Sequence, residues 1–253
     1  MNPYKLVIAY DGTNYHGWQE QAPGVATVAT VLQDSFKKVF GHEIKVVGAS
    51  RTDAGVHALG QVARFYTSLT INPKIIRKSW NASLPNDIQI RSLEPIVDEG
   101  RERIFHPQHN VHEKIYQYHF CSKRPLPFLA RFVHFHTAPL DIQKMRDCLQ
   151  SFVGEHNFSS FCAEGCKDDT VCTVKSVTLE YIRQYNIWRV TVRGKRFLHH
   201  MVRRMVGAAL KIACDKKLSP HEIVQALEKP GVYSHLPTVA AQGLVLRKII
   251  HER

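Results

Sequence analysis

The chain has 253 residues, enough for one large domain or two small ones. Its 44% hydrophobic and 22% charged residues are typical of a globular protein and exclude a largely disordered chain. A formal net charge of +12 favours a polyanionic partner, with nucleic acid as the first candidate. Lys and Arg outnumber Asp and Glu by 12 to 10 in residues 1–105 and by 22 to 12 in residues 106–253, so the second half carries most of this attraction.

The sequence predicts a cytoplasmic protein that does not enter a membrane. The N-terminus lacks the cationic leader, apolar run and cleavage site of a secretory signal. No stretch approaches the roughly 18 apolar residues that a membrane-spanning helix needs. The 6 cysteines are too few for a disulfide scaffold in a chain of this length, and we expect them to be reduced thiols.

The first half predicts alternating strands and helices. Residues 5–10 alternate in polarity and are rich in Val, Ile and Tyr, which indicates a strand closed by the turn pair Asp11-Gly12. The pair Asn72-Pro73 predicts a capped helix start. The other elements expected in this half are a helix at 28–40, strands at 43–47 and 61–66, the capped helix continuing to 83, and a strand at 87–93.

The second half predicts a similar order of elements. We expect strands at 114–122, 131–136, 174–182, 186–193 and 243–250, with helices from Asp141 to about 152, at 196–214, and after a capping box at 219–222. Two β-α-β-β-α-β units are typical of ferredoxin-like folds. The sequence therefore predicts an α+β protein with two ferredoxin-like domains, 1–105 and 106–253, which share a mainly antiparallel sheet with a cleft between them.

One loop stands out as a candidate site, GASRTDAGVHALGQVARF at residues 48–65. Gly48 and Gly55 indicate a tightly shaped loop, because glycine tolerates positive φ and close backbone approach. Asp53 lies two positions after Arg51. Spacing alone leaves two interpretations: a surface ion pair of little energetic consequence, or a carboxylate that a neighbouring cation keeps ionised for chemistry.

The loop resembles the GRTDAGVHA motif, followed by GQV, of TruA-type tRNA pseudouridine synthases. Other segments resemble blocks of the same family in the expected order: YDGTNYHGWQEQ (10–21), LPNDI (84–88), KIYQY (114–118), FVGEHNFSSF (152–161), FLHHMVRRMVG (197–207) and QGLVL (242–246). The resemblance spans nearly the whole chain. It implies an isomerase that converts uridine to pseudouridine in the anticodon stem-loop of tRNA, around positions 38 to 40, as a homodimer and without a cofactor or metal.

The resemblance also implies roles for four residues. Asp53 matches the catalytic aspartate, which acts either as a nucleophile at the sugar or as a base that removes a sugar proton. Arg51 matches the arginine that pairs with this aspartate. Tyr116 matches a tyrosine that packs against the target base, and Arg203 matches an arginine that helps to hold the displaced nucleotide.

Each role has a structural alternative. Residues 116 and 118 share one face of a strand, so both tyrosines also fit a hydrophobic core. Arg203 and His199 are four residues apart and predict a basic stripe on a helix, whereas Arg204 is expected on a solvated face. A mixed Cys and His cluster could bind zinc, although its spacings lack a C-x2-C pair; its members are His156, Cys162, Cys166 and Cys172.

Several positions depart from the family pattern. Ser50 replaces a glycine, Gln108 replaces an arginine after Pro107, Ala29 replaces a glutamine, and Cys172 replaces another arginine. Because phosphate contacts set the register of a bound nucleic acid, the loss of two cations predicts an altered or narrower range of substrates. A second hypothesis is a divergent paralogue that binds or refolds tRNA without chemistry.

Overall fold

The computed structural model describes residues 1–97, 105–109, 111–163, 169–229 and 236–252. It divides into two compact units, Met1–His112 with Leu246–Arg253, and Glu113–Val245. The end of the chain therefore lies in the first unit, whereas chain order alone placed all of 106–253 in the second. Gly60 allows this arrangement, since a Cβ atom there would lie 2.8 Å from the carbonyl oxygen of Arg247.

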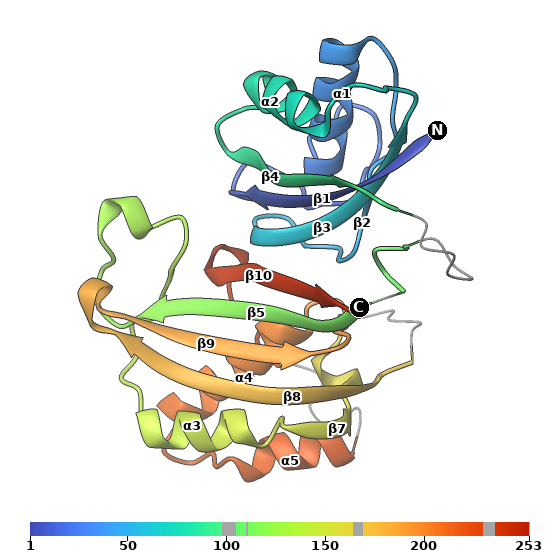
Figure 1. Cartoon of the computed structure of the whole chain (residues 1–253). Coiled ribbons are helices and arrows are strands. Elements are labelled where there is room, and N and C mark those ends of the chain that lie inside the picture. The colour runs from blue at the N-terminus through green and yellow to red at the C-terminus, as the bar shows by residue number, and fades with distance from the viewer. Residues whose placement is uncertain (98–104, 110, 164–168, 230–235, 253) are drawn as a thin grey trace. The chain divides into compact units, whose positions relative to one another are not determined.

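The first unit has the β-α-β-β-α-β order of a ferredoxin-like fold. Its elements are β1 (Asn2–Tyr10), α1 (Val28–Phe40), β2 (Val47–Gly48), β3 (His57–Thr67), α2 (Pro73–Ser83) and β4 (Ile88–Pro95), followed by most of β10 (Leu244–His251). β1 pairs antiparallel with both β3 and β4, and β2 pairs antiparallel with β3. α1 and α2 lie side by side on one face of these strands (Figure 1).

Aromatic packing fixes the two helices of the first unit to its sheet. Phe36 of α1, Trp80 of α2 and Phe65 of β3 are fully buried. The ring centroids of Phe36 and Trp80 lie 4.8 Å apart and those of Phe65 and Trp80 5.3 Å apart, both edge to face. The indole N–H of Trp80 also donates to the carbonyl oxygen of Leu32 at 3.2 Å. A buried indole that satisfies its donor in this way adds specificity to hydrophobic burial.

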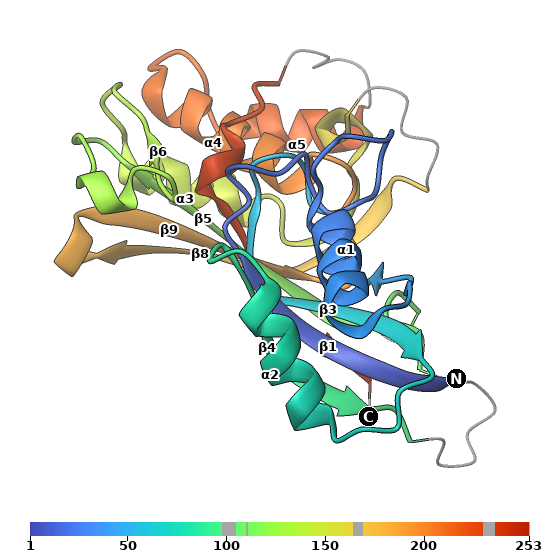
Figure 2. The same ribbon diagram turned by 90° about the horizontal axis from the view of Figure 1, so that it is seen from above.

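The second unit is built around an antiparallel sheet. Its elements are β5 (Val111–Cys121), β6 (His134–Phe135), α3 (Ile142–Gln150), β7 (Gly154–Asn157), β8 (Val171–Ile182), β9 (Ile187–Gly194), α4 (Met201–Cys214) and α5 (His221–Glu228). The strand order is β5-β9-β8-β7, and β6 pairs parallel with β5. α3 packs against α4, and Figure 2 shows both on the same side of β8 and β9.

The predicted α+β class with a mainly antiparallel sheet is confirmed, whereas the cleft between the domains stays a prediction. In the described part of the chain, no helix is both long and apolar enough to cross a membrane.

Three local predictions were wrong. Residues 43–46 are not a strand, because the backbone N–H of Val46 donates to the side chain of Gln33 at 3.0 Å. The helix expected from residue 196 begins only at Met201, because His200 has a left-handed backbone with φ +63°. The strand expected at 131–136 is reduced to His134–Phe135. β7 was not predicted, since its four residues, GEHN, carry no strand pattern.

Candidate active site

The loop that connects β2 to β3 carries the candidate aspartate at a tight turn. The carbonyl oxygen of Asp53 accepts a hydrogen bond from the N–H of Val56 at 3.1 Å. Gly55 completes the turn with φ +75°, a conformation that favours glycine. Asp53 is half-buried and Arg51 is exposed. The loop therefore presents a carboxylate at its surface from a backbone that is itself hydrogen-bonded.

A second segment, residues 11–18 after β1, is joined to this loop by backbone hydrogen bonds. The N–H of Trp18 donates to the carbonyl oxygen of Thr52 at 3.0 Å, and the N–H of Gly55 donates to that of Tyr15 at 3.3 Å. The hydroxyl groups of Tyr10 and Thr52 share a buried hydrogen bond of 2.7 Å. Residues on both sides of the aspartate are thus fixed by a part of the chain about 40 residues away.

Glycines in both segments allow the two backbones to touch. Gly17 has φ +90°, and a Cβ atom there would lie 2.5 Å from the carbonyl oxygen of Thr52. A Cβ atom at Gly12 would overlap the carbonyl of Val56, and one at Gly48 would overlap the indole of Trp18. These contacts explain structurally why YDGTNYHGW and the aspartate loop form one site.

A buried glutamine, which the sequence analysis did not single out, closes the start of the loop. Gln61 of β3 is fully buried and binds both backbone groups of Ser50: its Nε2 donates to the carbonyl oxygen at 2.6 Å, and its Oε1 accepts from the N–H at 3.2 Å. Gln108 donates to the carbonyl oxygen of Gly48 at 3.1 Å. The available signal was an amide side chain at the first position of the strand predicted at residues 61–66.

We expect Gln61→Leu to lower the free energy of unfolding by about 2–4 kcal/mol, because it leaves a buried N–H and a buried carbonyl of Ser50 without their partner. The matched control is Gln108→Leu, which removes one part-buried hydrogen bond made to the same loop by an exposed residue and should cost about 1 kcal/mol. Urea unfolding of both variants measures the difference. Equal losses would contradict the bracing role of Gln61.

The segment of residues 11–18 is itself anchored by buried polar contacts. The Nδ1 atom of His57 lies 3.0 Å from both the N–H of Gly12 and the carboxylate of Asp11. The hydroxyl of Tyr15 donates to the carboxylate of Asp87 at 2.5 Å. Burial, together with the hydrogen bond to Asp87, raises the pKa of Tyr15 well above its usual value, so its phenol remains a donor.

Tyr116 and Tyr118 lie on the same face of β5, in the second unit. Their cross-strand partners are Val192 and Val190 of β9. Tyr116 is buried and meets Phe197 edge to face, with ring centroids 5.3 Å apart. Tyr118 donates its hydroxyl to the carbonyl oxygen of Ala240 at 2.9 Å, and burial raises its pKa. The two tyrosines are thus buried neighbours on one face of β5.

The two arginines of α4 connect this helix to the chain that follows α5. The Nε atom of Arg203 donates to the carbonyl oxygen of Val239 at 2.9 Å. Arg204 was expected on a solvated face, but it is half-buried and donates to Cys162 and Thr238. The predicted stripe with His199 is also wrong, because that residue precedes the helix.

The structure places Arg51 and Asp53 on one loop of the first unit, and Tyr116 and Arg203 in the second. Among the described residues no ion pair joins Arg51 to Asp53.

Of the alternative zinc ligands, His156 and Cys172 face each other across β7 and β8, and Cys166 lies outside the described residues. In the described part of that cluster, His156, Cys162 and Cys172 do not converge as three ligands.

Comparison with known proteins identifies the family. A family model described as tRNA pseudouridine synthase matches residues 6–98 and 148–251. The tRNA pseudouridine synthase A of Thermodesulfovibrio yellowstonii is 36% identical over 257 residues, covering 98% of each chain. Its counterpart in Thermoanaerobacter sp. is 35% identical, covering 99% of this chain and 100% of the relative. The loop around Asp53 and the segments that brace it lie inside the first matched region, and the chain belongs to the tRNA pseudouridine synthase family of isomerases.

Proposed function

We propose that the protein converts uridine to pseudouridine in the anticodon stem-loop of tRNA, around positions 38 to 40, with Asp53 as the catalytic carboxylate. The observation that carries this proposal is the rigid support of the aspartate loop. Asp53 is the only acidic residue between Gly48 and Val56, and the residues around it are hydrogen-bonded to Tyr10, Trp18 and Gln61. Fixed placement of a reacting group is a major source of rate enhancement.

A single carboxylate can serve this isomerisation. The C1′–N1 bond of uridine breaks, the uracil turns, and a C1′–C5 bond forms; C5 then loses its proton and N1 gains one. No oxidant or reductant is consumed, and no cofactor is required by the balance of atoms. Ionised Asp53 acts either as the nucleophile at C1′ or as the base that removes a sugar proton and starts an elimination.

The other three residues are proposed to bind the substrate. A target base must leave its stack, at a cost of a few kcal/mol that protein contacts have to offset. Tyr116 offers an aromatic ring to the displaced base. Arg203 and the exposed Arg51 offer guanidinium groups to the nucleotide and its phosphates. The exposed side chain of Arg51 is proposed to contact the RNA, and the family resemblance further implies that it pairs with Asp53.

Tritium release tests the proposed reaction and its position. With tRNA labelled at C5 of uridine, the wild-type protein should release tritium, because C5 exchanges its proton for the new bond to C1′. Release should disappear with a tRNA whose uridines at positions 38 to 40 are replaced by cytidine. Continued release from this tRNA would contradict the anticodon assignment. Binding of tRNA without any release would favour the second hypothesis, a paralogue that binds or refolds tRNA.

We further propose a cytoplasmic homodimer, with one tRNA in contact with both subunits. This proposal rests on the family resemblance. Sedimentation at working concentration should give about twice the mass of the 28.9 kDa chain. A strict monomer under those conditions would remove the dimer from the proposal.

A further inference from the structure

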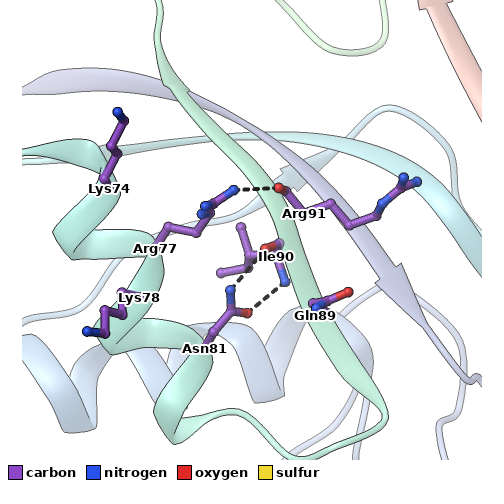
Figure 3. A pocket seen from close by; sticks show the side chains of 7 residues that line it. All are labelled: Lys74, Arg77, Lys78, Asn81, Gln89, Ile90 and Arg91. Carbon is purple, nitrogen blue, oxygen red and sulfur yellow. Dashed lines mark hydrogen bonds between the residues drawn. The ribbon is translucent and has the colours of Figure 1, made fainter.

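An open, positively charged groove lies between α2 and β4 in the first unit. It has a volume of about 610 Å³ and is lined by Lys74, Arg77, Lys78, Asn81, Gln89, Ile90 and Arg91 (Figure 3). Four of these seven side chains are cationic and none is acidic. No role in the proposed reaction accounts for such a charge.

Hydrogen bonds fix both walls of the groove. Asn81 of α2 binds the backbone of Ile90 twice, accepting from its N–H at 2.8 Å and donating to its carbonyl oxygen at 2.9 Å. Arg77 reaches across to the carbonyl oxygen of Arg91 at 2.7 Å, and Arg91 donates to that of Leu59 on β3 at 2.6 Å. Figure 3 shows the Arg91 guanidinium on the side of β4 away from α2. The edge strand β4 is therefore flanked by positive charge on both sides.

The charge on α2 is unfavourable for the helix itself. Lys74, Arg77 and Lys78 are three and four residues apart and so share one helix face, where like charges repel. They lie in the first half of the helix, at the positive end of its dipole, and Pro73–Ser83 contains no acidic residue. Neither helix stability nor capping explains this arrangement.

The groove cations also differ from other lysines of the same unit. Lys37 pairs with Glu43 at 2.8 Å, and Lys45 pairs with Glu20 at 2.6 Å. Within the described ranges of the chain, none of the four groove cations forms an ion pair with a carboxylate. Their positive charge is thus not neutralised by those residues and remains available to an anionic partner.

Strand register places the groove near the aspartate loop. Tyr10 of β1 pairs with Ala58 of β3 on one side and with Ile88 of β4 on the other. The start of β4 is therefore two strand spacings, about 10 Å, from the start of β3 that follows the loop. The contact between Tyr15 and Asp87 joins the same two regions. A separation of this size corresponds to a few nucleotides of an RNA strand.

We propose that the α2–β4 groove binds the phosphodiester backbone of the tRNA strand that flanks the target uridine. This inference rests on the proposed function and adds a binding surface to it. Lys74 and Lys78 act as point charges toward phosphates, while Arg77 ties α2 to β4 through the carbonyl oxygen of Arg91. The guanidinium of Arg91 is bonded to Leu59 of β3 instead. Contacts of this kind position an RNA without reading its sequence.

The double variant K74Q/K78Q tests the groove, because both side chains are exposed and neither makes a hydrogen bond with a described residue. Binding of an unmodified tRNA transcript to the full chain is measured between about 50 and 300 mM salt, because the screening of charges increases with the salt concentration. We expect about tenfold weaker binding near 0.1 M salt and a log–log salt slope smaller by about 2. KM for tRNA should rise while kcat at saturating tRNA stays unchanged.

Two further variants separate the groove from general charge effects. K37Q/K38Q removes two cations from α1 of the same unit and should leave the affinity within about twofold, whereas K74R/K78R keeps the charge and should retain binding. Unchanged affinity and slope in K74Q/K78Q, or an equal loss in K37Q/K38Q, would overturn the proposal. The proposal would also be overturned if vesicles of anionic lipid bound to the protein through Lys74 and Lys78 while the affinity for tRNA did not depend on these two residues. Because binding is measured without turnover, a wild-type protein that binds tRNA but releases no tritium would refute the reaction and not the groove.

Discussion

Replacing Asp53 with asparagine should abolish tritium release, lowering kcat by at least about 10⁴-fold, the size of effect seen when a central catalytic group is removed. An amide of nearly the same shape has neither the charge to attack C1′ nor the basicity to remove a sugar proton. The affinity for tRNA should stay within about threefold of the wild type, because most of the binding energy comes from phosphate contacts.

The matched control is Asp34→Asn, which removes one exposed carboxylate from α1 of the same unit. It changes the net charge equally and should leave both kcat and affinity unchanged. Thermal unfolding of the Asp53 variant verifies that the fold persists. Normal turnover by Asp53→Asn would show that another group performs the chemistry and would remove Asp53 from the proposal.

Local signals in the sequence predicted the two helices of the first unit to the residue. α1 begins after Thr27, whose side chain accepts from the N–H of Thr30, and it ends at Gly41 with φ +77°. α2 begins after Asn72, which accepts from the N–H of Lys74. Caps and turns of this kind depend on neighbours within four residues, so a pattern in the sequence is enough to locate them.

Contacts between distant residues could not be predicted in the same way. The two hydrogen bonds from Gln61 to Ser50 and the close approach of Gly60 to Arg247 depend on which strands become neighbours. Periodicity gives the face on which a side chain lies, but not its partner. The family motif located Asp53, whereas the reason for its rigid support became visible only with the packing of residues 11–18 against the loop.

That packing makes Gly17→Ala a strongly disruptive small substitution near the site. The new methyl group would lie 2.5 Å from the carbonyl oxygen of Thr52, and the residue would keep φ +90°. Either the loop or the segment after β1 has to move. We expect a loss of at least about 3 kcal/mol in the free energy of unfolding. A displacement of about 1 Å at the residue before Asp53 should also lower kcat on the order of 100-fold.

Gly24→Ala separates backbone strain from steric overlap. Gly24 has φ +87°, almost the same as Gly17, but no atom lies within 4 Å of a Cβ built there. This variant should lose only about 1–2 kcal/mol, the cost of a left-handed backbone, and should keep the kcat of the wild type. Urea unfolding and single-turnover tritium release measure both quantities for both variants. If the two alanines had equal effects, backbone conformation would account for them, and the contact between Gly17 and Thr52 would have no part in positioning Asp53.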